Sequence, residues 1–216
     1  MIEHHPPDDI LTDFVAGALD LGQHAAIATH LVSCERCRRF AHALEQVGGA
    51  WLSDLAPSEM GREAWMKVEA RLDEPSTLAP VNAPVCEDER PEVARLPRFI
   101  RAYALGEWRR VAPSVHLRPI LLPRPSATRV FLLKSGAGTR MLQHTHTGLE
   151  MTCVLTGAFM QDGGHYGPGD FDWGDEAADH RPIVEAEQEC VCLVAMQGKL
   201  RLKGFLGRLV QPFIRI

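Results

Sequence analysis

The hydrophobic side chains of this 216-residue chain recur with one period before residue 73 and with another after residue 95. Before the change they return every three to four residues, as on a helix. After it they fall in short runs bounded by glycine and proline, as in strands. The stretch between the two regions is interrupted by Pro75, Pro80, Pro84 and Pro91. Because proline at that density keeps a chain extended, the sequence predicts a helical domain over 1–72, a linker over 73–95 and an all-β domain over 96–216.

The first region predicts four helices. The first follows Pro6-Pro7, has its N-cap at Asp8 or Asp9 and extends to Leu19, and Gly22 separates it from the second. The other three are expected over about 23–32, 35–47 and 58–72. Gly48-Gly49 should stop the third helix, and Gly61 weakens the start of the fourth.

The second region predicts short strands separated by glycine-containing turns. The clearest runs cover 130–133, 150–155, 171–173 and 190–196. Several short strands at this spacing are typical of a β-sandwich or barrel.

The charge of the chain is divided unevenly and bears on its partners. Residues 1–80 carry 13 acidic against 6 basic side chains, a net charge of −7, whereas residues 81–216 carry a net charge of +2. An acidic first third disfavours nucleic acid as a partner, because binding to phosphate requires lysine and arginine. It suits a partner that is itself basic.

The sequence contains no apolar run long enough to span a bilayer, and its first residues lack the pattern of a secretion signal. We therefore expect a cytoplasmic protein with no membrane partner. In a reducing compartment the six cysteines should be thiols or metal ligands.

A first group of metal-binding side chains lies at the junction of the second and third predicted helices. His30, Cys34 and Cys37 form the pattern H-x3-C-x2-C, and on a helical path these positions lie on one side. Imidazole and thiolate are ligands that tetrahedral zinc prefers. The fourth ligand must come from elsewhere, and His4 and His5 are both available. The alternative is that the cysteines are half-buried helix residues and His30 lies on the surface.

A second group begins in a predicted strand. His144 and His146, two residues apart, project from the same face, and Glu150 follows on the next strand, in the pattern G-x5-H-x-H-x3-E-x6-G. Two imidazoles and a carboxylate suit zinc, iron, manganese or nickel. His180 is the natural fourth donor. Arg140, just before the first histidine, is either an anion contact or a solvated edge residue.

The remaining cysteines are given structural roles. Cys190 and Cys192 share one face of a strand, and we expect them to be buried small hydrophobic residues in preference to a redox pair. Cys153 has the opposite parity from Glu150 and should point away from that metal. Cys86 lies in the linker.

Both groups resemble known families. The pattern of His5 followed by His30, Cys34 and Cys37 resembles that of the zinc-binding anti-sigma domain. The resemblance implies that these four residues are the zinc ligands. In that family the domain binds an extracytoplasmic-function sigma factor. The second pattern resembles the first cupin motif, and Tyr166 to Asp170 with His180 resembles the second. This implies a jelly-roll barrel that holds a metal through His144, His146, Glu150 and His180.

Taken together, the two domains resemble the ChrR-type anti-sigma factors. The resemblance implies that the helical domain inhibits a sigma factor and that the cupin responds to an oxidant such as singlet oxygen, with no enzymatic activity. Four apolar residues of the fourth predicted helix are candidate anchors for the partner: Met60, Trp65, Val68 and Leu72. The alternative is that they form part of the domain's own core. A rival reading is a cupin metalloenzyme of dioxygenase type with a helical oligomerisation domain. A DNA-binding zinc module is a third, which the negative charge disfavours.

Overall fold

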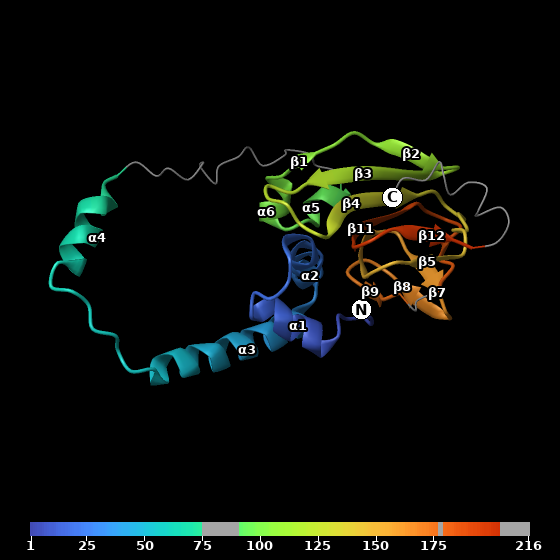
Figure 1. Cartoon of the computed structure of the whole chain (residues 1–216). Coiled ribbons are helices and arrows are strands. Elements are labelled where there is room, and N and C mark those ends of the chain that lie inside the picture. Colours follow the sequence, from blue (N-terminus) through green and yellow to red (C-terminus); the bar gives the residue numbers. More distant parts are fainter. Residues whose placement is uncertain (75–90, 177–178, 204–216) are drawn as a thin grey trace.

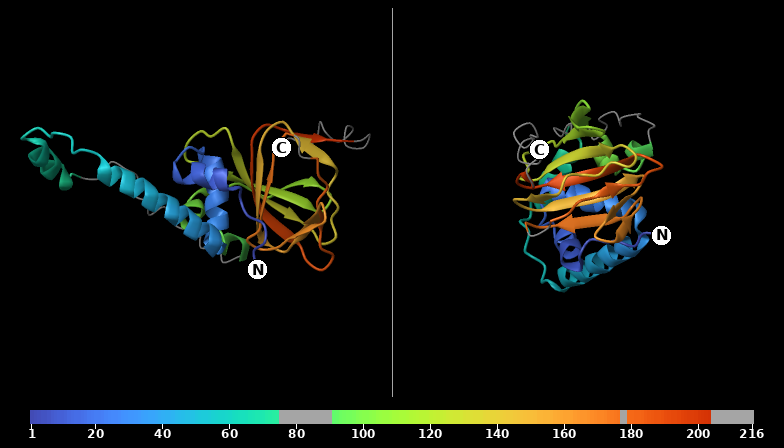
Figure 2. Two further views of the ribbon diagram at one scale, coloured as in Figure 1. Left: turned by 90° about the horizontal axis from the view of Figure 1, so that it is seen from below. Right: turned by 90° about the vertical axis from the view of Figure 1, so that its right-hand side faces the viewer.

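The computed structural model describes residues 1–74, 91–176 and 179–203, and arranges most of them in three layers. Helices from the first third of the chain cover one face of a large antiparallel sheet, and two smaller sheets close a barrel behind its other face (Figures 1 and 2). The expected order of helices followed by an antiparallel β domain is confirmed.

The large sheet has seven strands in the order β1-β3-β4-β11-β6-β9, with β2 pairing to β3. Their bounds are β1 Ala104–Leu105, β2 Arg109–Ala112, β3 Val115–Leu121, β4 Arg129–Ser135, β6 Glu150–Thr156, β9 Phe171–Gly174 and β11 Cys190–Met196. The smaller sheets are β10-β7-β8, formed by Ile183–Val184, Phe159–Gln161 and Gly164–Tyr166, and β12-β5, formed by Leu200–Leu202 and His144–His146. All four strands expected from the sequence are confirmed.

Strand β11, in the middle of the sheet, is buried along its whole length. Its side chains alternate between two cores, because successive residues of a strand point to opposite faces. Val191, Leu193 and Ala195 belong to the core shared with the helices. The other four residues of the strand belong to the core inside the barrel. One sheet therefore forms the wall between two separate hydrophobic interiors.

Helix α2 (Leu21–Ser33) lies directly on the outer face of this sheet, flanked by α1 (Asp8–Val15) and α3 (Glu35–Asp54) (Figure 1). Ala25, Ala26 and Ile27 on its sheet-facing side are fully buried. Gly22 allows the closest approach, because a Cβ atom there would lie 2.5 Å from the carbonyl oxygen of Thr128. Small residues thus let the helix backbone come down onto the barrel.

The N-terminus of α2 is tied to the barrel by Asp20. One carboxylate oxygen accepts hydrogen bonds from the backbone N–H groups of Gly22 and Gln23, and the Gln23 side chain accepts one in return from the Asp20 N–H. The other oxygen accepts one from the Thr128 hydroxyl at 2.7 Å. This capping box satisfies donors that a helix start leaves open. Burial alone would raise the pKa of Asp20, but the hydrogen bonds from Gln23, Thr128 and Ser126 lower it below its ordinary value.

Five features predicted for the helices were wrong. The N-cap of α1 is Pro7, and Asp8 and Asp9 lie in its first turn; Gly22 lies inside α2 and does not separate the first two helices. The first helix ends at Val15 and not Leu19, because Gly17 adopts a left-handed φ of 69° and closes its C-terminus. The third continues through Gly48-Gly49 to Asp54. Each glycine inside a helix costs only about 1 kcal/mol relative to alanine, which is too little to stop a helix of this length. The fourth, α4 (Ala64–Leu72), begins six residues after Ser58 and lacks a side-chain cap.

The linker expected over 73–95 is helical in its last part. Helix α5 (Pro91–Ala94) packs against the barrel with Val93 fully buried, and α6 (Arg98–Arg101) follows. Residues 75–90 of the predicted linker, Cys86 included, and the segment 204–216 lie outside the described residues. Among the residues that are described, no helix combines the length and apolarity needed to cross a membrane.

Replacing Asp20 by alanine should lower the free energy of unfolding by about 1–2 kcal/mol at neutral pH, because α2 loses its cap. The lowered pKa means that the charge-dependent part of this stability is present above the ordinary carboxyl value of 3.8 and is lost as the pH falls through the folded-state value. The difference in the free energy of unfolding between wild type and Asp20→Ala should therefore become smaller at acidic pH. Urea denaturation followed by circular dichroism across a pH series measures it. Asp13→Ala, on the exposed side of α1, is the control, and a difference that stays constant into acid would contradict the expectation.

Candidate metal centres

The first cluster brings together four donor groups from four places in the first 37 residues. His5 lies on the extended segment before α1, His30 near the end of α2, Cys34 between α2 and α3, and Cys37 in the first turn of α3. One ligand atom of each lies within 4.8 Å of all the others. The His5 Nδ1 atom is 3.4 Å from the sulfur of Cys34 and 3.4 Å from that of Cys37.

These separations fit a tetrahedral zinc ion. Bond lengths of about 2.3 Å to sulfur and about 2.0 Å to nitrogen place the donor atoms of such a site roughly 3.5 Å apart. The Nε2 atom of His30 is buried and has no hydrogen-bond partner. Because a buried polar atom without a partner is costly, a cation bound by this nitrogen would remove the cost.

The ionisation of the cluster also suits a cation. Burial lowers the pKa of His30 to about 4, so the ring is neutral at pH 7 and keeps a lone pair for a metal. Burial and the hydrogen bond with Cys34 raise the pKa of the Cys37 thiol to about 12. Sulfur so placed becomes a thiolate when a divalent cation lies beside it.

The structure separates the two neighbouring histidines that the sequence could not tell apart. His5 belongs to the cluster, whereas His4 stacks on Tyr166 with ring centroids 3.9 Å apart and its Nε2 lies 3.1 Å from the His165 carbonyl oxygen. His4 is thus occupied against the barrel.

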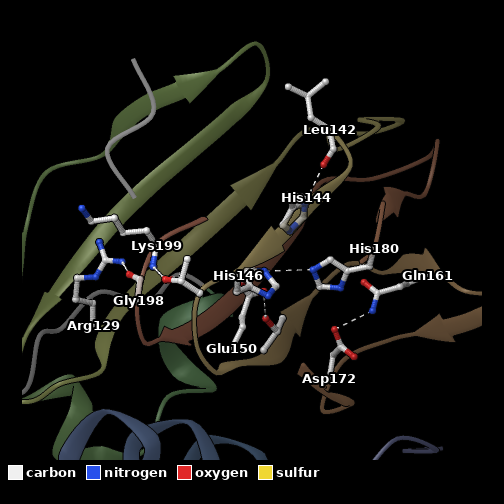
Figure 3. A network of polar contacts seen from close by, with 12 residues as sticks. Arg129, Leu142, His144, His146, Glu150, Gln161, Asp172, His180, Gly198 and Lys199 are labelled. Atoms are coloured by element: carbon white, nitrogen blue, oxygen red, sulfur yellow. Dashed lines mark hydrogen bonds and ion pairs between the residues drawn. The ribbon is translucent and has the colours of Figure 1, made fainter. Parts of the chain in front are cut away.

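The second cluster lies inside the barrel, on the other side of the large sheet. His144 and His146 come from β5, and His180 reaches them through a β-bridge to His144. One ring nitrogen of each lies within 4.8 Å of the other two, and the Nε2 atoms of His146 and His180 are 3.4 Å apart (Figure 3). His144 turns its Nδ1 atom to the Leu142 carbonyl oxygen at 2.7 Å, which leaves Nε2 for the cluster.

Glu150, at the start of β6, lies next to the three histidines and contacts His146. Its carboxylate lies 2.9 Å from the Nε2 atom of His146 (Figure 3). Burial would raise the pKa of Glu150, but the hydrogen bond and charge of His146 lower it, so the carboxylate is ionised. Burial lowers the pKa of His144 and that of His180. Burial would lower the pKa of His146, but the hydrogen bond and charge of Glu150 raise it. Three imidazoles and one carboxylate are a donor set suited to a divalent transition metal.

Two cavities meet at this cluster. The larger, of about 480 Å³, is lined mainly by apolar side chains of β2, β3, β4, β11 and β12 and of the segment before β5, with His144 and Glu150 among its polar lining. The smaller, of about 60 Å³, lies against Glu150, His180 and Asp172. Arg140 is exposed and lines the larger cavity, within reach of an anionic group entering it.

The cysteines of the barrel divide as the parity of the strands predicts. Cys153 packs in the core shared with the helices, away from the second cluster. Cys190 and Cys192 face the barrel interior with sulfur atoms 3.6 Å apart, and they line the smaller cavity. They are buried as expected, and they lie closer to the second cluster than the sequence indicated.

Two polar residues beside the second cluster were not anticipated. Asp172 on β9 accepts a hydrogen bond from the Gln161 amide at 3.0 Å, and both line the smaller cavity (Figure 3). No spacing pattern marks these residues, since Gln161 and Asp172 come together only when β7 and β9 fold over the barrel.

Known proteins resemble the chain in both domains. Residues 98–200 match the family model described as the ChrR cupin-like domain, and residues 8–38 match one described as a putative zinc-finger. The anti-sigma-E factor ChrR of Cereibacter sphaeroides is 35% identical over 216 residues, which cover 100% of this chain and 99% of that one. A crystal structure of Rhodobacter sphaeroides SigE in complex with the anti-sigma ChrR matches with a TM-score of 0.72 and 30% identity, over 91% of this chain and 100% of the matched chain.

Substitution of the neighbouring histidines tests the first cluster. With Co²⁺ as the probe, the wild-type chain should show the intense near-ultraviolet absorption of thiolate bonded to cobalt. His5→Ala should weaken Co²⁺ binding by at least about tenfold, since one of four ligands is lost. His4→Ala, the matched control, should bind Co²⁺ as the wild type does. Equal loss from both variants, or from neither, would contradict the placement of His5.

Proposed function

The chain belongs to the family of the anti-sigma factor ChrR, and we propose that it binds and inhibits an extracytoplasmic-function sigma factor through its N-terminal helical domain. The residues assigned to that domain are 1–72, with zinc held by His5, His30, Cys34 and Cys37. The single observation that carries the proposal is an uncovered apolar surface on α3 and α4, the parts of the helical layer that extend away from the barrel (Figure 1). Because a sigma factor acts on DNA and polymerase inside the cell, the proposed site of action is the cytoplasm.

Nine large apolar side chains on α3, α4 and their connection are exposed. Trp51 on α3 is 72% exposed and Trp65 on α4 is 64% exposed. Exposed apolar neighbours along the same two helices and their connection are Val47, Leu52, Leu55, Met60, Met66, Val68 and Leu72. Extended apolar patches of this kind mark protein interfaces, and tryptophan is enriched among the residues that dominate binding energy. Met60, Trp65, Val68 and Leu72 are all exposed and would therefore be available as anchors for the proposed partner.

The short, exposed helix α4 also supports the proposal that a partner covers this surface. It has nine residues, none of them buried. Isolated helices of that length are marginal in water, because few backbone hydrogen bonds offset the cost of nucleation. A partner that covers its apolar side would stabilise it. The net charge of −7 over residues 1–80 favours a basic partner surface, such as one that otherwise binds DNA.

The zinc centre would act by holding the helices in order. Its four ligands join the N-terminal segment, the end of α2 and the start of α3. A bound zinc ion supplies folding energy at such a junction. The direction in which α3 leaves the barrel, and with it the position of Trp51, would then depend on the metal.

The cupin domain is proposed to receive an oxidative signal such as singlet oxygen. Its cluster would hold zinc, iron, manganese or nickel through His144, His146, Glu150 and His180. The larger cavity lets a small apolar molecule approach these residues, and the histidine rings and the Cys190 and Cys192 sulfurs nearby are oxidisable. A chemical change at the cupin site that lowers the affinity of the helical domain for the sigma factor would release the sigma factor.

Affinity capture tests the binding function. Co-expressed with a tagged extracytoplasmic-function sigma factor of the same genome, the wild-type chain should be captured as a stable complex. Cys34→Ser with Cys37→Ser should abolish capture, because the helices lose their zinc. Trp51→Glu with Trp65→Glu should weaken it by at least about a hundredfold while zinc content stays normal, since each removes an apolar anchor.

The control for capture is Leu121→Glu, which alters an apolar side chain that is 56% exposed on the barrel. It should be captured like the wild type. Failure of the zinc-loaded wild-type chain to capture any such sigma factor would refute the proposed function.

Illumination of the purified complex with a photosensitiser tests the sensing function. The wild-type complex should dissociate as singlet oxygen is produced, and azide, which quenches it, should prevent this. His144→Ala with Glu150→Ala should still capture the sigma factor but should not release it. His116→Ala, a histidine outside both clusters, should release it normally. Equal release from all three complexes would count against a role of the cupin site in sensing.

A further inference from the structure

A tight turn of the barrel reaches across to the N-terminal cluster. It covers residues 167–170, between β8 and β9, and is held rigidly. The Asp170 N–H donates to the Gly167 carbonyl at 2.9 Å, and the Gly167 N–H donates to the Asp170 carboxylate at 2.8 Å. Two further backbone hydrogen bonds of 2.8 and 3.0 Å join Gly169 and Asp170 to Val154 on β6. The turn is therefore a fixed part of the barrel wall.

Asp170 holds the segment that carries His5. Its carboxylate, in a residue only 4% exposed, accepts hydrogen bonds from the backbone N–H of Glu3 at 2.7 Å and of His4 at 2.9 Å. The Phe171 N–H donates to the His4 carbonyl at 3.1 Å. Three hydrogen bonds thus fix the two residues immediately before His5. No helix or strand contains this segment, so these contacts decide where the His5 ring lies.

The same turn orients His30. The His30 Nδ1 atom lies 2.8 Å from the Gly169 carbonyl oxygen, while its Nε2 atom points into the cluster. A hydrogen bond of this kind from the second ring nitrogen fixes the orientation of a metal-binding histidine. Gly169 has a φ of 95°, and a Cβ atom there would lie 2.6 Å from the Ile2 side chain. The close approach therefore requires glycine.

Strand β9 continues from this turn to the second cluster. The Phe171 ring packs edge-on against His30, with centroids 5.7 Å apart. Asp172, the next residue, faces the barrel interior and lines the smaller cavity with Glu150 and His180. Residues 170, 171 and 172 therefore contact in succession the His5 segment, the His30 ring and the surroundings of the second cluster.

We propose that the 167–170 turn is a shared support of the two clusters, with Asp170 as the positioning residue for His5, and that metal loaded in the barrel tightens metal binding in the helical layer. This coupling deepens the proposed function, on which it rests, by naming the contact through which the cupin acts on the zinc-binding domain. The barrel thus contacts two of the four N-terminal donors: it fixes the segment that carries His5, and it orients the ring of His30, which α2 carries.

The first test measures Co²⁺ at the N-terminal site in the full-length chain, by its thiolate absorption and by competition with a chelator. The second cluster contains no cysteine, so Co²⁺ held by its histidines does not contribute to this absorption. Asp170→Ala should weaken Co²⁺ binding by about 10–100-fold and shift the visible ligand-field bands. Asp170→Asn should restore part of the affinity, since its amide oxygen still accepts from Glu3 and His4.

Two further variants keep this test decisive. Glu3→Pro removes the N–H donor on the other side of the contact, outside any helix or strand, and should weaken Co²⁺ binding in the same direction even if Asp170→Ala folds poorly. Glu187→Gln removes an exposed carboxylate of the barrel and should have no effect. Unchanged affinity and spectrum in both Asp170→Ala and Glu3→Pro would overturn the positioning role.

A double-mutant cycle tests the coupling. His180→Ala, which disables the barrel cluster, should weaken N-terminal Co²⁺ binding several-fold in the wild-type background and should have no added effect in the Asp170→Ala background. Independent effects of the two substitutions would overturn the coupling. These measurements need no sigma factor, so loss of capture by the wild-type chain would refute the proposed function and leave this result standing.

Discussion

The burial of α2 against the outer face of the large sheet is the contact on which the rest of the structure depends. Ala25, Ala26 and Ile27 are fully buried there, and the capping box of Asp20 ties the start of the helix to the barrel. Because α2 carries His30 in its last turn and leads through Cys34 into α3, its position on the sheet determines where the first cluster forms. The helical layer is thus built on the barrel and does not form a separate core.

The sheet beneath α2 gives the two clusters a common wall. Strand alternation sends one set of β11 side chains to the helices and the other to the barrel interior. Close-packed interiors of this kind do not deform continuously, and they switch between discrete arrangements. Moving a domain from 99% binding-competent to 1% requires about 5.5 kcal/mol of differential stabilisation. Under the proposed function, loss or gain of a metal ligand near such a wall is a change of sufficient size.

Much of the molecule could be predicted because it depends on short-range spacing. The intervals between His30, Cys34 and Cys37, and between His144 and His146, place donors on one face through backbone geometry alone. The four strands were found for the same reason. Helix ends were less predictable: the left-handed turn at Gly17 stops α1, whereas Gly48-Gly49 does not stop α3. Glycine ends a helix here only where it adopts the left-handed conformation, as Gly17 does; Gly48 and Gly49 keep the helical conformation.

By itself, then, the sequence determined the order of helices and strands, the spaced donors of each cluster (His30, Cys34 and Cys37; His144, His146 and Glu150) and the acidity of the first third. Tertiary structure alone decided that His5 enters the cluster while His4 stacks on Tyr166, because the buried carboxylate of Asp170 fixes the backbone just before them. It likewise placed Asp172 beside Glu150, and left Trp51 and Trp65 uncovered. The physical reason is that local spacing is set by the backbone of one element. Contacts between residues more than a hundred positions apart are set by which surfaces the whole chain can bury together.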